Sequence, residues 1–119
     1  MCGINGIFGL ENIEAPKSVI QQMNNALQHR GPDADGVFAD EQVALGHRRL
    51  SIIDLSPESN QPFYSQDNNV VLVMNGEIYN YLELKKELPD YPFRTNSDTE
   101  VLLAAYLTWG ISFLHKLNG

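Results

Sequence analysis

The sequence predicts a small α+β domain, because segments with the patterns of strands and of helices both occur along its 119 residues. Residues 70–74 form a continuous apolar run, which is typical of a strand buried on both faces. Between Pro16 and Arg30 the apolar positions recur at helical spacing. Ser97 and Glu100 form a capping box, in which Ser97 caps a helix and Glu100 reaches back to its start. The length fits one domain with a single core.

The other elements of the N-terminal half are short. Residues 4–10 form an apolar run among glycines and predict a buried strand. The helix over Pro16–Arg30 begins with a proline in its first turn and ends in a basic last turn before Gly31-Pro32. Residues 36–39 and 43–47 predict two strands joined by a turn.

The C-terminal half combines a loop with helices. Residues 56–69 are rich in Ser, Pro, Asn and Gln and predict a loop with one short extended piece at Phe63-Tyr64. A helix is expected over residues 79–88, where a proline follows it. The capped helix is expected over residues 97–109, and a further short helical piece over residues 111–117.

The only cysteine, Cys2, directly follows the initiator methionine. Because cysteine has a small side chain, we expect an aminopeptidase to remove Met1 and to leave Cys2 with a thiol and a free α-amine. The reference pKa values of these groups, about 8.5 and about 7.7–8.0, lie close together and close to cellular pH. The amine can therefore accept the thiol proton without a histidine partner. The alternative interpretation is a lone cytosolic thiol at a frayed chain end.

The composition argues against several classes of protein. A net charge of −7 and a pI of about 4.7 argue against binding to nucleic acid, which requires clustered Lys and Arg. The longest apolar run, residues 101–107, is too short to span a bilayer, and the N-terminus lacks the pattern of a secretion signal. A single cysteine cannot form an internal disulfide, which fits a reducing compartment. We therefore expect a cytoplasmic protein that binds neither nucleic acid nor membrane.

Three polar groups follow or cap predicted elements: Arg48-Arg49, Asn75-Gly76-Glu77 and Asp98. Each has a plain structural explanation, as surface arginines, a tight turn and a carboxylate favoured by a helix N-terminus. Together with Cys2, however, they supply what an amide hydrolase for a free amino acid needs. That set is a nucleophile, oxyanion donors, a guanidinium for the carboxylate and acids for the ammonium group.

The motifs that contain these residues resemble the glutaminase domain of glutamine-hydrolysing asparagine synthetases, a class II glutamine amidotransferase family with an N-terminal nucleophile. The motifs are Cys2-Gly3-Ile4, Arg30-Gly31-Pro32-Asp33, Gly46-His47-Arg48-Arg49-Leu50-Ser51-Ile52, Asn75-Gly76-Glu77-Ile78-Tyr79-Asn80 and Ser97-Asp98-Thr99-Glu100. They occur in this order, and the resemblance covers essentially the whole chain. Arg-Gly-Pro-Asp combined with Asn-Gly-Glu-Ile-Tyr-Asn is more similar to the asparagine synthetase branch than to the glucosamine-phosphate or phosphoribosylamine branches.

The resemblance implies three catalytic residues. Cys2 would attack the side-chain amide carbon of glutamine, with its own α-amine accepting and returning the proton. Asn75 through its side-chain NH2 and Gly76 through its backbone N–H would form the oxyanion hole. Water would then release glutamate from a thioester, and ammonia would leave for a second site.

The resemblance also implies the residues that bind the substrate. Arg49 would hold the α-carboxylate of glutamine, and Glu77 with Asp98 would hold the α-ammonium group. A guanidinium suits this role because it can bind a carboxylate through two parallel hydrogen bonds. The glutaminase chemistry needs no metal and no cofactor, and it needs none of the three histidines, for which we expect structural or surface roles.

The fold implied by the resemblance is a four-layer αββα sandwich of the N-terminal-nucleophile hydrolase type. That fold continues past residue 119, so residues 1–119 are expected to form a partial glutaminase domain without the synthetase domain. ATP and Mg²⁺ are expected for the synthetase domain, which would amidate aspartate. The expected partners are glutamine and glutamate, the synthetase domain of the same full-length chain, and a second copy in a homodimer joined through exposed edges.

Two alternatives remain open on the residues alone. One is a non-catalytic fragment that binds glutamine and retains Met1, because a retained methionine leaves Cys2 without a free amine. The other is an amidotransferase domain that serves a different acceptor. Nothing within these residues distinguishes aspartate from other acceptors.

Overall fold

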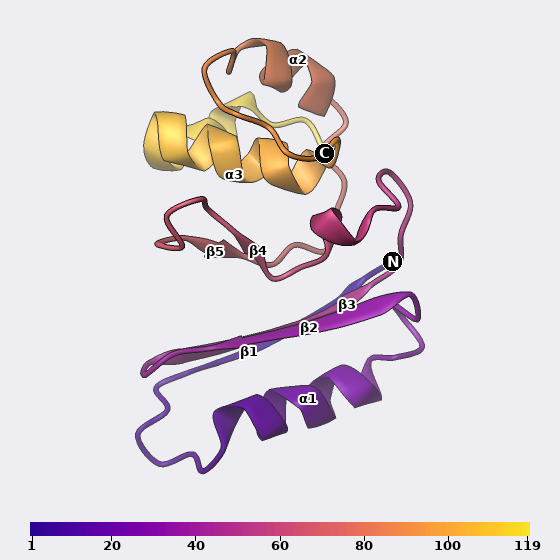
Figure 1. Cartoon of the computed structure of the whole chain (residues 1–119), viewed down its shortest axis with the longest axis vertical. Helices are drawn as coiled ribbons and strands as arrows, with labels where there is room; N and C mark the ends of the chain where they lie inside the picture. Colours follow the sequence, from indigo (N-terminus) through magenta and orange to yellow (C-terminus); the bar gives the residue numbers. More distant parts are fainter. The chain divides into compact units, whose positions relative to one another are not determined.

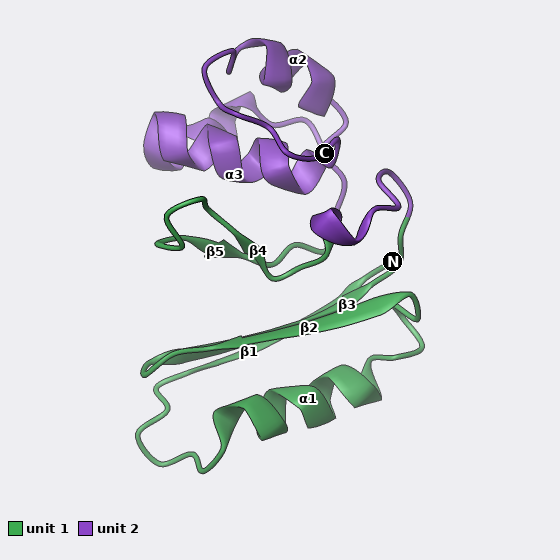
Figure 2. Ribbon diagram, viewed as in Figure 1, with its two compact units in different colours: residues 1–51, 60–75 green, residues 52–59, 76–119 purple.

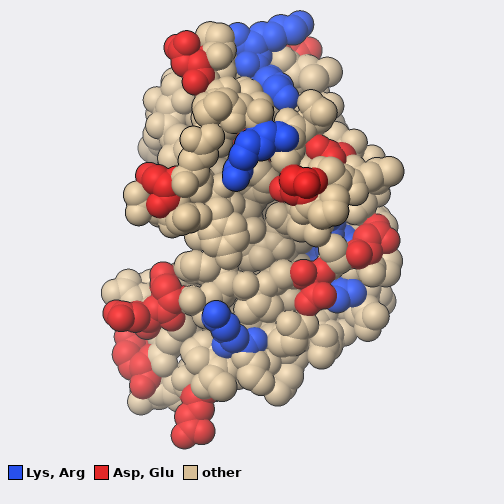
Figure 3. Space-filling model, in the orientation of Figure 1, with Lys and Arg blue, Asp and Glu red and all other residues tan.

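The computed structural model describes residues 1–119 and contains both strands and helices, which confirms the α+β class (Figure 1). The chain divides into two compact units (Figure 2). Unit 1 contains residues 1–51 and 60–75, and unit 2 contains residues 52–59 and 76–119. Lysine and arginine side chains stand singly or in small groups among acidic ones on the face drawn in Figure 3.

A three-stranded antiparallel sheet forms the centre of unit 1. Its strands are β1 (Gly3–Phe8), β2 (Ala34–Ala39) and β3 (Val43–Arg49), in the order β1-β3-β2. The register pairs Gly3 with Arg48, and Phe8 with Val43. The predicted strands over residues 36–39 and 43–47 are therefore confirmed and each extends by two residues.

Helix α1 (Pro16–Ala26) covers one face of this sheet, where Ile20 packs with Leu10 and Ala44. The helix was predicted to continue to Arg30 but ends at Ala26, and turns follow it. The turns bring Arg30 to the start of β1, where its Nε–H donates to the Cys2 carbonyl at 3.1 Å.

Two asparagines connect α1 to the sheet beneath it. Asn5 Nδ2 on β1 donates to Asn24 Oδ1 at 2.7 Å, and Asn24 Nδ2 donates to the Gly36 carbonyl on β2 at 3.0 Å. Gly46 on β3 leaves the necessary room, because a Cβ there would collide with both asparagine side chains. These side chains therefore fit only this register of the strands.

The prediction that the first strand is buried is wrong for one of its faces. Gly3 faces Leu27 on the α1 side of the sheet. On the other face Ile4 is 47% exposed and Phe8 is 83% exposed. Strand β1 lies at an edge of the sheet, so only the face under α1 is well covered.

A short hairpin of β4 (Phe63–Tyr64) and β5 (Val71–Leu72) lies on the sheet face opposite α1 (Figure 1). Tyr64 makes an edge-to-face contact with Phe38 of β2, with ring centroids 6.1 Å apart. Unit 1 therefore stacks a helix, a sheet and a hairpin. The expected extended piece at Phe63-Tyr64 is confirmed.

The strand predicted over residues 70–74 is present only at Val71–Leu72 and is half-buried rather than buried on both faces. It pairs with β4 alone, through Leu72 with Phe63 and Val71 with Tyr64. Beyond Leu72 the backbone of Met74 bonds to side chains instead of a neighbouring strand. The apolar run identifies a strand but overstates its length.

Unit 2 consists of helices. It contains the 3₁₀ helix η1 (Pro57–Ser59), α2 (Tyr81–Lys86), α3 (Asp98–Trp109) and the 3₁₀ helix η2 (Gly110–Lys116). Leu88, Ala104 and Ala105 form one buried hydrophobic cluster in it. Helix α2 is shorter than predicted, whereas the ends predicted for α3 are confirmed within one residue. No helix in either unit combines the length and the apolar character needed to cross a membrane.

The capping box of α3 is confirmed in one half and wrong in the other. The Glu100 N–H donates to Ser97 Oγ at 3.2 Å, as predicted. The Glu100 carboxylate does not reach the Ser97 N–H, but accepts from the backbone N–H of Thr95 at 2.6 Å and of Arg94 at 3.0 Å. Through these bonds the completely buried Glu100 orders the segment before the helix as well as the helix start.

Candidate functional site

Cys2 is held at the start of β1 by contacts with the end of β3. The Leu50 N–H donates to Cys2 Sγ at 3.3 Å, and Sγ lies 3.7 Å from the Leu50 carbonyl oxygen. The Nε–H of Arg30 donates to the Cys2 carbonyl oxygen. The side chain is half-buried. These contacts argue against the alternative of a thiol at a frayed end.

The strand register brings Cys2 and Arg49 together. Gly3 is paired with Arg48, so the preceding residue, Cys2, lies across from Arg49. Directly opposed residues in an antiparallel pair share a face and lie within side-chain contact range. Arg49 is only 7% exposed, and its guanidinium donates to Asn60 Oδ1 at 2.7 Å. Unit 1 therefore presents a thiol beside an oriented, mostly buried guanidinium.

Arg48 and Arg49 are neighbours in sequence but point to opposite faces of the sheet. Arg48 Nε donates to the Gly31 carbonyl at 2.8 Å, and its NH1 lies 3.4 Å from the Asp35 carboxylate. These contacts tie Arg48 to β2 and to the segment before it. Arg48 is therefore structural, and Arg49 is the arginine on the cysteine's face.

Asn75 is the last residue of unit 1 and is exposed. The residue before it, Met74, is held on both sides by side chains of unit 1. Its N–H donates to Gln61 Oε1 at 2.6 Å, and its carbonyl oxygen lies 3.1 Å from His47 Nε2. Sequence reasoning missed both partners. Strand alternation could have placed His47 on the face of Arg49, because the two residues are two positions apart in one strand. Gln61 lies in a predicted loop, where no pattern indicates a role.

His47 is completely buried and has one hydrogen-bonded ring nitrogen. Burial lowers the pKa of His47; the Met74 carbonyl acts in the opposite direction, and the charge of Arg49 lowers it further. The ring is therefore neutral at pH 7. Since a carbonyl oxygen can only accept, the proton is on Nε2, and Nδ1 is buried without a partner.

Glu77 and Asp98 are brought close together in unit 2. Asp98 is the first residue of α3, and its Oδ2 accepts the N–H of Ile78, the residue after Glu77, at 2.9 Å. Asp98 is buried, whereas Glu77 is exposed. Gly76 is also exposed, and no atom lies near the position of an added Cβ.

A hydrogen-bonded frame holds the segment before Asp98. Asp54 Oδ1 accepts the Ser56 N–H at 2.8 Å, and Asp54 Oδ2 accepts the Asn96 N–H at 2.9 Å. These bonds hold the pKa of Asp54 well below its usual range. The carboxylates of Asp54 and Glu100 thus anchor the loop that leads into Asp98.

The predicted site residues therefore form two groups, each within one unit. Cys2, Arg49 and Asn75 belong to unit 1, and the acidic pair with Gly76 belongs to unit 2. The structure places Cys2 across from the strand end that carries Arg49, and it holds Asp98 against the residue after Glu77. Their roles in catalysis and binding stay predictions.

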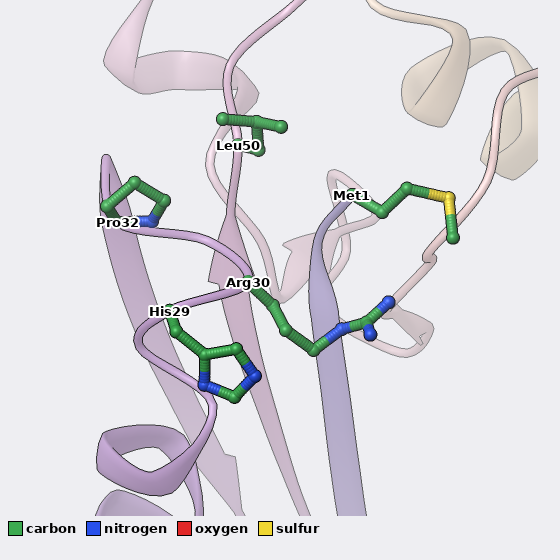
Figure 4. A pocket seen from close by; sticks show the side chains of 5 residues that line it. All are labelled: Met1, His29, Arg30, Pro32 and Leu50. Atoms are coloured by element: carbon green, nitrogen blue, oxygen red, sulfur yellow. The ribbon is translucent and has the colours of Figure 1, made fainter.

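A pocket of about 400 Å³ opens beside the start of β1 (Figure 4). Its lining residues come from three segments of unit 1: Met1, His29, Arg30, Pro32 and Leu50. Two of them, Arg30 and Leu50, also contact Cys2. The pocket is therefore adjacent to the cysteine, with one permanent positive charge in its wall.

The sequence matches the glutamine amidotransferase domain family over residues 1–119. The chain belongs to this family. This membership confirms the resemblance that the motifs of Cys2, Arg49 and Asn75 indicate. Cys2 and Arg49 thus belong to a chain of the glutamine amidotransferase domain family.

Relatives of this amidotransferase domain are longer proteins. The chain is 47% identical over 124 residues to asparagine synthetase [glutamine-hydrolyzing] 1 of Bacillus subtilis (strain 168), and covers 20% of that protein. It is 42% identical over 122 residues to asparagine synthetase B of Escherichia coli (strain K12), and covers 22% of it. A Zea mays asparagine synthetase is 42% identical over 120 residues and is covered to 20%. In each case all of this chain is matched, so it spans about a fifth of these relatives.

Proposed function

We propose that this amidotransferase domain hydrolyses the side-chain amide of glutamine with Cys2 as the nucleophile and supplies ammonia to a second reaction. The observation that carries the proposal is the position of Cys2 beside the buried Arg49 on one face of the sheet. A thiol beside an oriented guanidinium suits an amino-acid substrate, whose carboxylate the guanidinium can bind while the thiol attacks the amide.

The reaction begins after Met1 has been removed, because the α-nitrogen of Cys2 is otherwise in a peptide bond. Met1 is 75% exposed and accessible to an aminopeptidase. The freed amine takes the thiol proton, and sulfur attacks the amide carbon to form a tetrahedral oxyanion. The carbon–nitrogen bond then breaks as the amine returns the proton, and ammonia leaves. Water cleaves the remaining thioester to glutamate and regenerates the thiol.

Asn75 and Gly76 are proposed to stabilise the oxyanion, and loss of one such donor typically lowers turnover about 10²- to 10³-fold. Glu77 and Asp98 are proposed to bind the α-ammonium group. The contact of Asp98 with the Ile78 N–H supports a common role, because it holds the aspartate next to the Glu77 segment. Arg49 is proposed to bind the α-carboxylate, and its bond to Asn60 orients the guanidinium for that task.

For the whole protein we propose glutamine-dependent synthesis of asparagine. The relatives named above carry this activity in their names, and they contain about four-fifths of additional chain. ATP, Mg²⁺ and aspartate would act in that additional part, and the ammonia would pass to it within one chain. The four-layer sandwich, the homodimer and the cytoplasmic location remain parts of this proposal. The acceptor is tested by supplying the full-length protein with ATP and either aspartate or another carboxylate.

The glutaminase proposal is tested by intact-mass measurement before and after treatment with an electrophilic glutamine analogue. Loss of one methionine and gain of one adduct are expected, with the adduct on Cys2. Excess glutamine should protect Cys2, and Cys2→Ser should prevent the adduct. A chain that keeps Met1 and gains no adduct would support the non-catalytic alternative instead.

A further inference from the structure

The peptide between Met74 and Asn75 is held by a side chain from the sheet. Its carbonyl oxygen belongs to Met74 and accepts the Nε2 proton of His47 at 3.1 Å. A peptide group is planar, so fixing its oxygen also fixes the nitrogen and the direction in which the Asn75 backbone begins. Gln61 fixes the other side of Met74 by accepting its N–H at 2.6 Å.

These two side chains take the place of a strand neighbour. The β4–β5 ladder ends at Leu72, and Met74 makes these bonds to side chains beyond the end of the ladder. His47 belongs to β3 and, by strand alternation, lies on the same face as Arg49. The rigid strand that carries the proposed carboxylate-binding residue therefore also fixes the residue before Asn75.

The burial of His47 calls for an explanation. Its ring is completely buried and leaves Nδ1 without a hydrogen-bond partner, a state that costs stability. An apolar side chain of similar size would fill the same space without this cost. The bond from Nε2 to the Met74 carbonyl is what an apolar side chain would lack.

We propose that His47 and Gln61 are positioning residues for Asn75, which hold the Met74 backbone so that the Asn75 amide stays where the oxyanion forms. The inference rests on the proposed role of Asn75 as an oxyanion donor. Small displacements of a reacting group cost large factors in rate, about 10²-fold for about 1 Å. His47 acts through Met74 and contacts neither the nucleophile nor, in this proposal, the substrate.

The test compares His47→Met, which removes the donor, with His47→Gln, whose amide nitrogen can replace Nε2. In the intact protein that contains residues 1–119, His47→Met is expected to lower the kcat of glutamine hydrolysis about 10- to 100-fold. KM should stay within about threefold, because Arg49 keeps its place. His47→Gln should recover most of the loss. Gln61→Met and Gln61→Glu form the matching pair for the oxygen that accepts the Met74 N–H. The first variant removes this acceptor and should lower kcat, and the second keeps it and should recover most of the loss.

Combination with Asn75→Ala separates positioning from general damage. If His47 acts through Asn75, adding His47→Met to Asn75→Ala should lower kcat by no more than about threefold. An undiminished loss in the double variant would overturn the inference. So would an unchanged kcat in the single His47→Met variant while Asn75→Ala is slow. If Asn75→Ala itself turns over normally, the oxyanion role fails, and the positioning role fails with it.

Ile20→Ala provides the control for lost stability. Ile20 is completely buried against Leu10 and Ala44 on the sheet face under α1, opposite the face of His47. It should lower the thermal unfolding midpoint by at least as much as His47→Met and leave kcat nearly unchanged. An equal loss of kcat in Ile20→Ala would show that destabilisation alone explains the result and would overturn the inference.

Discussion

The two groups of predicted site residues are positioned in different ways. In unit 1, Cys2 and Arg49 obtain their relative place from the register of two strands, which many backbone bonds share. In unit 2, Asp98 and the segment of Glu77 are placed by individual bonds between side chains and backbone. Substitutions in the first group should therefore change chemistry with little effect on folding. Those in the second should affect both.

Replacement of the nucleophile is the sharpest test of the first group. Cys2→Ala should lower glutamine hydrolysis by about 10⁴-fold or more, because no thioester can form. Ammonia release is the measurement. The unfolding transition should stay nearly unchanged, since the sulfur makes two long hydrogen bonds, both with the Leu50 backbone. Residual activity within about tenfold of the unmodified protein would remove Cys2 from the mechanism.

The paired arginines test whether the face of the sheet decides the role. Arg49→Lys should raise the KM for glutamine about 10- to 100-fold with a smaller effect on kcat, because an ammonium cannot replace the two-pronged guanidinium. Arg48→Lys serves as its control. It should lower stability through the lost bond to Gly31 and leave KM unchanged. If both variants keep the KM of the parent protein, neither arginine binds the substrate.

Asp98→Asn tests the mixed behaviour expected of unit 2. The amide keeps an oxygen for the Ile78 N–H but loses the negative charge, so the KM for glutamine should rise about fivefold to 20-fold. Thermal unfolding should shift by a few degrees as well, since the charge at the start of α3 is also lost. If the thermal unfolding midpoint changes and the KM does not, Asp98 stabilises the start of α3 and does not bind the substrate.

Asp54→Asn should affect stability alone and gives the smallest effect. Because the pKa of Asp54 is lowered in the folded state, its ionised form stabilises unit 2 above the unfolded pKa of about 4. That contribution decreases as the pH falls below this value. The midpoint difference between Asp54→Asn and the parent should therefore be larger at pH 7 than at pH 3. A difference that does not change with pH would contradict the ionic origin.

The same contrast explains what the sequence could predict. Strand alternation and helix periodicity follow from local patterns, so β2, β3, the start of α1 and the ends of α3 agree with expectation. The prediction missed the end of α1, beyond which Arg30 contacts the Cys2 carbonyl, a contact between residues far apart in the sequence that local periodicity does not reveal. The shortening of the strand at Val71–Leu72 likewise follows from its pairing with β4 alone.

The residues of the candidate site also show what local sequence patterns can and cannot predict. Cys2 and the arginine pair stand out in the sequence, and alternation places only one of the two arginines on the cysteine's face. The role of Gln61 could not be predicted, because its partner is the backbone N–H of Met74. Almost every residue has such a group, so the residue type does not reveal it. Glu100 belongs to a recognisable capping box, yet its carboxylate binds the Thr95 N–H instead of the expected one.

The bond between Asn5 and Asn24 supports the strand alignment that decides on which face of the sheet the sulfur emerges. Sliding β1 by one residue against β3 would turn every side chain of the strand to the opposite face, and the thiol would then point toward α1. Asn5 fits over Gly46 and is bonded to the helix only in the observed alignment. Asn5 thus has no part in the chemistry, but it stabilises the strand alignment in which the Cys2 thiol faces away from α1.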